Sequence, residues 1–279
     1  MGGIINIFLD PLFMFVLLPK GYEVLGAGIA TMLSNVITCS YFLTVILRMK
    51  GSNILSLSVR NFIPSRANVY SIFAVGVPAA IAVTLFDITY IIIDKLASGY
   101  GDIPLAAVGI VLKAERLPLN VGIGLCQGMM PLAAYNYSSG NFKRMRETVN
   151  FSRLVGLVIG FVAVAVYELC APYIMRIFIE DAQTVELGTH FLRARSLATP
   201  FMFMCFHLVN FFQAVGHGGK ALALGAARWV VFNIPLLFVM RHIFGMYGIV
   251  WTQVVADIMM TIVSVIVYWR FERSIHAEN

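Results

Sequence analysis

Long apolar runs separated by short polar segments dominate the chain. A helix needs roughly 20 apolar residues to cross a bilayer, and most of these runs reach that length. Backbone groups inside a bilayer must be paired within their own segment, so we expect helices rather than open strands. The predicted spans are residues 4–18, 24–47, 69–97, 104–135, 151–171, 187–215, 221–241 and 246–269. The pattern therefore predicts an all-α, polytopic integral membrane helix bundle.

Composition and charge support this class. The chain is 59% hydrophobic and 12% charged, which is too apolar for a soluble domain of 279 residues. Its net charge of +6 does not indicate nucleic acid, because the basic residues gather in alternate connections between the runs. By the positive-inside rule these connections face the cytoplasm, and both termini are predicted to lie there. The four cysteines have no CxxC or Cys/His spacing, so neither a disulfide frame nor a zinc site is expected.

The first two and the last two spans share a layout that predicts an internal repeat. Each pair has a proline in its first helix, Pro11 or Pro235, and enters its second helix through closely spaced glycines. If the last pair closes a six-helix unit, the first pair closes an earlier unit whose other four helices are absent from this sequence. We thus expect residues 1–48 to be the final two helices of an N-terminal lobe, 49–68 a cytoplasmic linker and 69–279 a six-helix lobe. The alternative is that any two apolar hairpins look alike.

One stretch carries a family resemblance. It reads "LAAVGIVLKAERLPLNVGIGLCQGMMPLAAYNYSSGN", and its most specific positions are Gln127, Gly128, Pro131, Asn136, Tyr137 and Ser138. With "GAGIATMLSN", "FFQAVGHGGKALALGAARWVVFNIPLLFV" and "GMYGIVWTQVVADIM", the chain resembles the multidrug and toxic compound extrusion (MATE) transporters over essentially its whole length. The resemblance implies a 12-helix fold of two six-helix lobes, of which this chain matches the second lobe and the last two helices of the first.

The same resemblance implies a function. MATE transporters are secondary antiporters in the cell membrane, here that of a bacterium, and export drugs and organic cations against inward flow of Na⁺ or H⁺. It implies no enzyme activity and no cofactor beyond the coupling ion. The expected partners are cationic amphiphilic small molecules, the lipid bilayer and an N-terminal half that the chain lacks. We therefore expect this form to be inactive or partner-dependent.

Charged residues inside the predicted spans are the candidate coupling site. Asp87 lies about 15 Å below the outer surface, and Lys113, Glu115 and Arg116 in the next helix lie at about the same depth. We expect these four side chains to form one neutral cluster, which either lines a pathway or only locks two helices. Asp87 is the first candidate to take up Na⁺ or a proton, and the resemblance implies an acidic residue in its helix.

Further candidates lie in later spans. Asp257 shares a helix face with Gln253, and is either a second coupling acid or the acceptor of a hydrogen bond between helices. His207 is either a packed histidine or a proton relay. Aromatic and methionine side chains suit flat cationic drugs, so we assign a substrate cavity to Met129, Phe203, Phe206, His207 and Asn210.

Three other functions compete with this one. A flippase for lipid-linked precursors would need a larger cationic cavity, for which only Lys113 and Arg116 are available. A membrane-embedded enzyme would need a signature such as His-Glu-x-x-His, which does not occur in the sequence. An inactive half-carrier that acts only through association with other membrane proteins is the third alternative.

Overall fold

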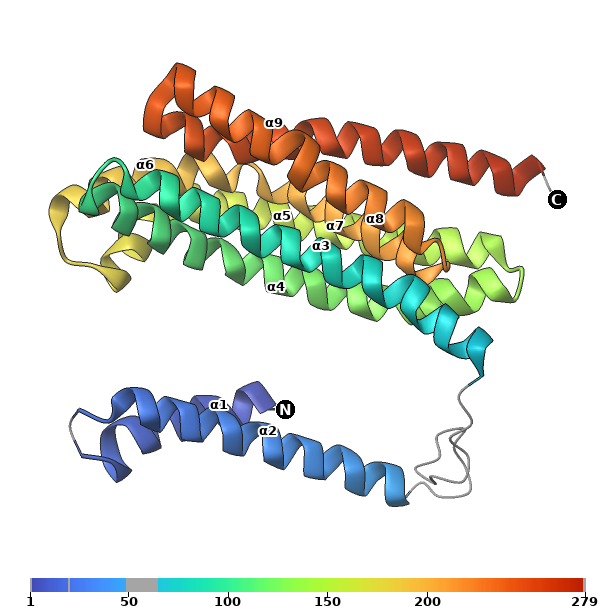
Figure 1. Ribbon diagram of the computed structural model, residues 1–279, viewed down its shortest axis with the longest axis horizontal. Coiled ribbons are helices and arrows are strands. Elements are labelled where there is room, and N and C mark those ends of the chain that lie inside the picture. Colours follow the sequence, from blue (N-terminus) through green and yellow to red (C-terminus); the bar gives the residue numbers. More distant parts are fainter. Residues whose placement is uncertain (1, 20, 49–64, 278–279) are drawn as a thin grey trace. The chain divides into compact units, whose positions relative to one another are not determined.

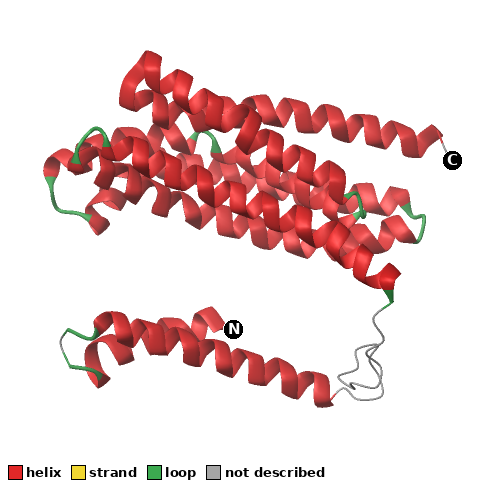
Figure 2. Ribbon diagram, in the orientation of Figure 1, coloured by secondary structure: helices red, strands yellow, loops and turns green. Residues whose placement is uncertain are grey.

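The computed structural model describes residues 2–19, 21–48 and 65–277. These residues are helical apart from short turns, and they contain no strand (Figure 2). The chain divides into two compact units, Met1–Ser65 and Arg66–Asn279, each of which is described by itself. The predicted linker, 49–68, lies mostly outside the described residues.

The first unit is a helical hairpin. Helix α1 (Gly2–Pro11) continues into a short π-helix, η1 (Leu12–Leu17), and α2 (Glu23–Arg48) follows. The π-helix begins directly after Pro11, whose missing N–H removes one α-helical hydrogen bond. A Cβ atom at Gly26 would lie 2.8 Å from the carbonyl oxygen of Phe13, so the close approach of α2 to η1 requires glycine there.

The second unit begins with three long helices, α3 (Arg66–Ser98), α4 (Asp102–Ser138) and α5 (Phe142–Phe178). Tight turns join them, and each turn contains a glycine with positive φ, Gly101 or Gly140. At 37 residues, α4 and α5 are about 55 Å long, which exceeds the thickness of the hydrocarbon core. All three are long and apolar enough to cross a membrane.

The next predicted span is a bent pair of helices. The direction of the chain bends by 47° between helices α6 (Ala182–Ser196) and α7 (Thr199–Ala214). Pro200 lies in the first turn of α7, where it needs no backbone partner, whereas in a continuous helix it could not donate to the carbonyl oxygen of Ser196 and its ring would clash with that group. The bend therefore follows from the local sequence.

The last two predicted spans form a second hairpin. Helix α8 (Gly218–Ala226), the π-helix η3 (Ala227–Asn233) and α9 (Ile234–Ala277) follow one another without a loop. The backbone of α9 breaks at Gly245, where φ is 61°, and the chain folds back there (Figure 1). Each predicted span thus coincides with a helix or a bent helix pair, which confirms an all-α membrane helix bundle. By length and composition alone, five helices of the described residues could cross a membrane, with Gly218–Arg273 counted as one helix. The number is six if the bent pair of α6 and α7 is counted as one span.

Two hydrophobic clusters make up the core of the second unit. One contains Ile93, Phe191 and Leu237, and the other contains Phe211 and Met260, with their neighbours. On α9, Val250 belongs to the first cluster and Met260 to the second, and Gln253 and Asp257 lie between them in the sequence. A layer of polar side chains therefore separates the two clusters.

Candidate functional site

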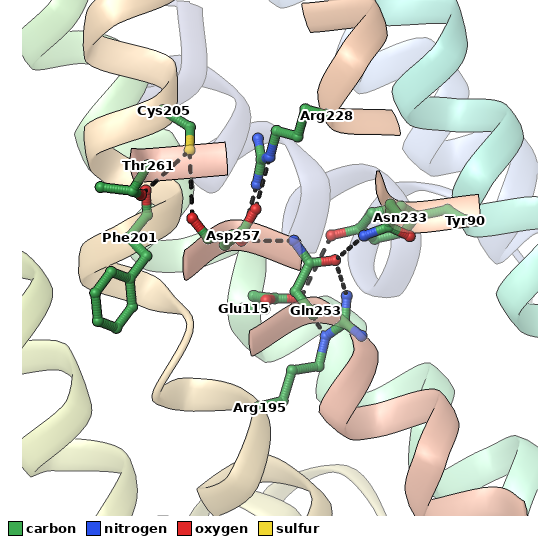
Figure 3. A network of polar contacts seen from close by, with 10 residues as sticks. All are labelled: Tyr90, Glu115, Arg195, Phe201, Cys205, Arg228, Asn233, Gln253, Asp257 and Thr261. Carbon is green, nitrogen blue, oxygen red and sulfur yellow. Dashed lines mark hydrogen bonds and ion pairs between the residues drawn. The ribbon is translucent and has the colours of Figure 1, made fainter. Parts of the chain in front are cut away.

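Four charged side chains from four helical elements meet in this polar layer (Figure 3). Glu115 comes from α4, Arg195 from α6, Arg228 from η3 and Asp257 from α9. Each is at most 3% exposed. Because a buried charge without a partner is costly, such groups are found in pairs, and here two acids face two arginines.

Arg228 and Asp257 form a two-pronged ion pair. Nε of Arg228 donates to Oδ1 of Asp257 at 2.7 Å, and Nη2 donates to Oδ2 at 3.0 Å. Nε2 of Gln253, one turn earlier on α9, donates to the same Oδ2 at 2.7 Å. The guanidinium group also lies over the rings of Phe206 and Trp229, at 4.7 and 4.5 Å from their centres. Both carboxylate oxygens of Asp257 are therefore occupied, and the pair is fixed on all sides.

Glu115 and Arg195 form the second pair, which is less complete. Nε of Arg195 donates to Oε2 of Glu115 at 2.7 Å, and the hydroxyl of Tyr90 donates to the same oxygen over a longer 3.4 Å. The other carboxylate oxygen, Oε1, is buried and has no hydrogen-bond partner among the described residues. This oxygen and Oδ1 of Asn233, which is likewise buried without a partner among the described residues, are open acceptor positions of the layer.

Gln253 connects the two pairs. Its side-chain oxygen accepts from Nη2 of Arg195 at 3.5 Å and from Nδ2 of Asn233 at 3.0 Å, while its nitrogen donates to Asp257. A change of charge at Glu115 would leave Arg195 without a counter-charge, because an arginine stays protonated in proteins. The layer can thus link proton binding on α4 to the contacts that α6 makes with α9.

The exposed faces of α4 and α5 differ in polarity. The exposed residues of α5 are apolar along the middle of the helix: Phe151, Leu154, Val158, Phe161, Val162, Val166 and Leu169. We define the α4 polar face as Lys113, Arg116, Asn120, Gly124 and Gln127, which are all exposed and lie within one stripe at helical spacing. An exposed apolar face suits lipid, whereas charged side chains at this depth line water or a pathway.

The predicted single charge cluster is split between these two places. Glu115 is buried in the polar layer, while Asp87, Lys113 and Arg116 are exposed. In the described part of the chain no ion pair joins Asp87 to either cation, and Arg195 rather than a cation of α4 pairs with Glu115. The reason is geometric: residues one or two positions apart on a helix do not face each other.

Sequence reasoning missed the two arginines of the polar layer. Neither Arg195 nor Arg228 is among the predicted candidates, although Arg228 lies inside the apolar run "GAARWVVFN". A single arginine within such a run is the signal that could have identified it as buried. The predicted common face of Gln253 and Asp257 is confirmed by their 2.7 Å hydrogen bond.

The predicted substrate-cavity residues lie in the packing between helices. Met129, Phe203 and His207 are 3%, 5% and 0% exposed. The ring of Phe203 fills the space beside Gly122 and Gly156, where a Cβ atom would overlap it. Phe206 lies against Arg228, and Asn210 donates to the carbonyl oxygen of Phe206 in its own helix. Their contact with a substrate stays a prediction.

His207 is buried, and neither of its ring nitrogens has a hydrogen-bond partner within the described residues. His207 is thus a packed histidine, 0% exposed, but no hydrogen bond to a neighbouring carbonyl holds it within the described residues. The proton relay stays a prediction.

A sodium site at Asp87 also stays a prediction. No group of three or more His, Cys, Asp or Glu side chains that could hold a metal ion occurs in the described residues. The hydroxyl of Thr84, three residues before Asp87 on α3, donates to the carbonyl oxygen of Ala80 in its own helix.

A pocket of about 510 Å³ lies apart from the polar layer, where α5 ends and α6 begins. Its charged lining is mixed in sign and contains Arg176, Glu180, Glu186, His190 and Arg193. Nearby, Asp181 caps α6. Its carboxylate accepts from the hydroxyl and the backbone N–H of Thr184, and these bonds hold the pKa of Asp181 below its usual value.

Comparisons with known proteins agree with this architecture. The MatE family matches residues 78–239. The chain is 31% identical over 253 residues to the multidrug export protein MepA of Staphylococcus haemolyticus, and 29% identical over 268 residues to that of Staphylococcus saprophyticus. These matches cover 91% and 95% of this chain, but only 54% and 57% of the relatives. The chain thus spans little more than half the length of the curated relatives it matches.

Solved structures show the same fold. An outward-facing multidrug resistance MATE family transporter matches 99% of this chain, and 61% of its own length, with a TM-score of 0.87 and 24% identity. The MATE transporter VcmN of Vibrio cholerae matches 98% of this chain, and 61% of its own length, with a TM-score of 0.86 and 19% identity.

Proposed function

Because the chain belongs to the MatE family, we propose that it acts in a bacterial cell membrane as a multi-pass secondary carrier that exports small organic molecules against an inward flow of protons. The observation that carries this proposal is the buried layer of Glu115, Arg195, Arg228 and Asp257 between two hydrophobic clusters. Ionisable groups at this depth are expensive and are typical of ion pathways.

Glu115 is the proposed site of proton uptake. Its Oε1 is free among the described residues, while Arg195 holds Oε2. A sodium ion bound there would lie close to the guanidinium group of Arg195, and the two cations would repel each other. A proton neutralises the carboxylate without adding a further charge, so the geometry favours H⁺ over Na⁺.

The other two acids have different proposed roles. Both oxygens of Asp257 already accept hydrogen bonds, so Asp257 holds η3 against α9 and takes no part in proton uptake. Asp87 is exposed on α3 and has no ion pair in the described part of the chain, so we assign it to the path toward Glu115. It is the entry group in this scheme.

The proposal is tested with the purified chain in proteoliposomes. An inward proton gradient is imposed, and the movement of a cationic dye, ethidium, and an anionic dye, carboxyfluorescein, is recorded. We expect gradient-driven movement of at least one dye, and Glu115→Gln should reduce it to the rate seen without a gradient. Asp94→Asn is the matched control, since Asp94 is an exposed acid near the end of α3.

Two outcomes contradict the proposal. A chain that inserts but moves neither dye under the gradient overturns the carrier function and favours the inactive half-carrier. Movement that remains gradient-dependent in Glu115→Gln, but is lost in Asp87→Asn, overturns the role of Glu115 and restores Asp87 as the coupling acid.

A further inference from the structure

Two exposed cations lie near the middle of α4. Lys113 is 11 residues and Arg116 14 residues beyond Asp102, the first residue of this 37-residue helix, which places them about 16 and 21 Å along it. Both are exposed, and neither has an ion pair within the described residues. The guanidinium group of Arg116 lies 5.9 Å from the centre of the Tyr90 ring, which is at most a weak contact.

The residues that follow extend the same polar stripe. Asn120 and Gln127 place amide groups on the α4 polar face, and Gly124 leaves space between them, since no atom lies within 4 Å of where its Cβ would be. Lipid does not satisfy such groups, as the apolar exposed face of α5 shows by contrast. The α4 polar face therefore suits water or a polar ligand rather than lipid.

The charge balance of the second unit gives the sign of that ligand. Inside the polar layer, the acids Glu115 and Asp257 are each neutralised by an arginine. Of the exposed charges near mid-helix on α3 and α4, Asp87 is negative and Lys113 and Arg116 are positive, which leaves an excess of one positive charge. Protonation of Asp87 would raise that excess to two.

We propose that the α4 polar face binds an anionic group of the transported molecule: a carboxylate, sulfonate or phosphate on an amphiphilic compound. This inference rests on the proposed carrier function and replaces the organic cations expected from the sequence. Arg116 offers a planar fork that suits two oxygens, and Lys113 adds a point charge one turn away. Leu117 and Val121, exposed beside the stripe, would contact the apolar part of the compound.

A binding assay with two matched probes tests the sign of the charge. The purified chain is placed in nanodiscs of zwitterionic lipid, and binding is measured by pyrene fluorescence against empty nanodiscs. One probe is pyrenebutyrate, and the other carries a trimethylammonium group on an alkyl chain of the same length. We expect tighter binding of pyrenebutyrate, and roughly tenfold weaker binding of it by Lys113→Gln/Arg116→Gln, because hydrogen bonds to charged groups are lost.

A control variant removes two other exposed cations. Lys143→Gln/Arg144→Gln changes the start of α5 by the same charge and should leave both affinities unchanged. The reversal Lys113→Glu/Arg116→Glu should turn the preference toward the ammonium probe. This readout does not need transport, and circular dichroism checks that each variant is folded.

The outcomes separate this inference from the carrier function. Binding of pyrenebutyrate that depends on Lys113 and Arg116, without gradient-driven dye movement, supports anion binding by the α4 polar face and overturns the carrier function. A wild-type preference for the ammonium probe that the double variant keeps overturns the inference and leaves the carrier in place. Binding of neither probe also overturns the inference.

Discussion

The ion pair between Arg228 and Asp257 allows a quantitative prediction. Arg228→Met removes the charge but keeps most of the apolar stem, and leaves the carboxylate of Asp257 with Gln253 as its one remaining side-chain donor among the described residues. Asp257→Leu leaves a guanidinium group that is 3% exposed with two aromatic rings as neighbours. Each single variant therefore leaves a buried charge uncompensated, whereas the double variant leaves none.

The magnitude follows from burial and distance. Removing one partner of a buried ion pair costs about 3–5 kcal/mol of the free energy of unfolding, and two unit charges about 4 Å apart attract each other by about 4 kcal/mol at an effective dielectric constant of 20. Ordinary hydrogen bonds between membrane helices contribute only about 0.6 kcal/mol on average and at most about 1.7. We expect a coupling energy of about 3 kcal/mol from the two bonds at 2.7 and 3.0 Å.

The assay is a double-mutant cycle on reversible unfolding in bicelles. The free energy of unfolding is measured for the wild type, the two single variants and the double variant. The control cycle uses Arg193→Met and Glu168→Leu, because that pair has a separation of 3.8 Å and side chains 39% and 42% exposed. A pair so exposed should show a coupling energy of about 0–1 kcal/mol.

The reasoning fails if the two cycles give the same coupling energy. It also fails if the double variant is as unstable as the sum of the single changes, since the two charges would then not stabilise each other. A double variant as stable as the wild type agrees with it, because an apolar pair of similar volume can replace a buried ion pair at no cost.

Two further predictions concern packing and pH. Gly156→Val should destabilise the fold by about 1–3 kcal/mol, because the added atoms overlap the ring of Phe203. Gly109→Ala has open space beside it and should stabilise the fold by about 0.5–1 kcal/mol. Thermal unfolding measures both changes, and equal effects of the two variants would contradict the packing around Phe203. His217 lies in the turn between α7 and α8, where partial burial and then the ammonium group of Lys220 lower its pKa. The neutral form is thus favoured in the folded state, and its contribution to stability, complete above the ordinary pKa of about 6.5, is lost as the pH falls below it. The melting temperature should therefore fall more between pH 8 and pH 5 for the wild type than for His217→Gln, and equal falls would refute this.

The sequence predicted the helices well because span length and hydropathy are local properties. A run of apolar residues indicates a membrane helix whichever helices pack against it. The glycines Gly26 and Gly248 marked the entries to α2 and to the second limb of α9. The common face of Gln253 and Asp257 was equally accessible, since a spacing of four places two side chains on one side of a helix.

The partners of the charged residues could not be predicted in the same way. Glu115 pairs with Arg195, 80 positions later in the chain, and helical periodicity gives the direction of a side chain but not the helix that it meets. Proximity in the sequence pointed instead to Lys113 and Arg116, which lie on the exposed face of α4, whereas Glu115 lies on its buried face. The bend before Pro200 was also missed, because the hydropathy is continuous across residues 187–215 although the helix is interrupted there.

The arginine inside η3 has a consequence for the assembly of the protein in its membrane. An arginine at the centre of a helix opposes exit from the translocon by about 2.5–3.5 kcal/mol, and Asp257 is synthesised 29 residues after Arg228. The segment that contains η3 would then wait at the translocon until the limb of α9 beyond Gly245 has been made. The two limbs would enter the lipid together as a preformed, charge-neutral hairpin, and a nascent chain that stops before Asp257 would fail to anchor its final segment.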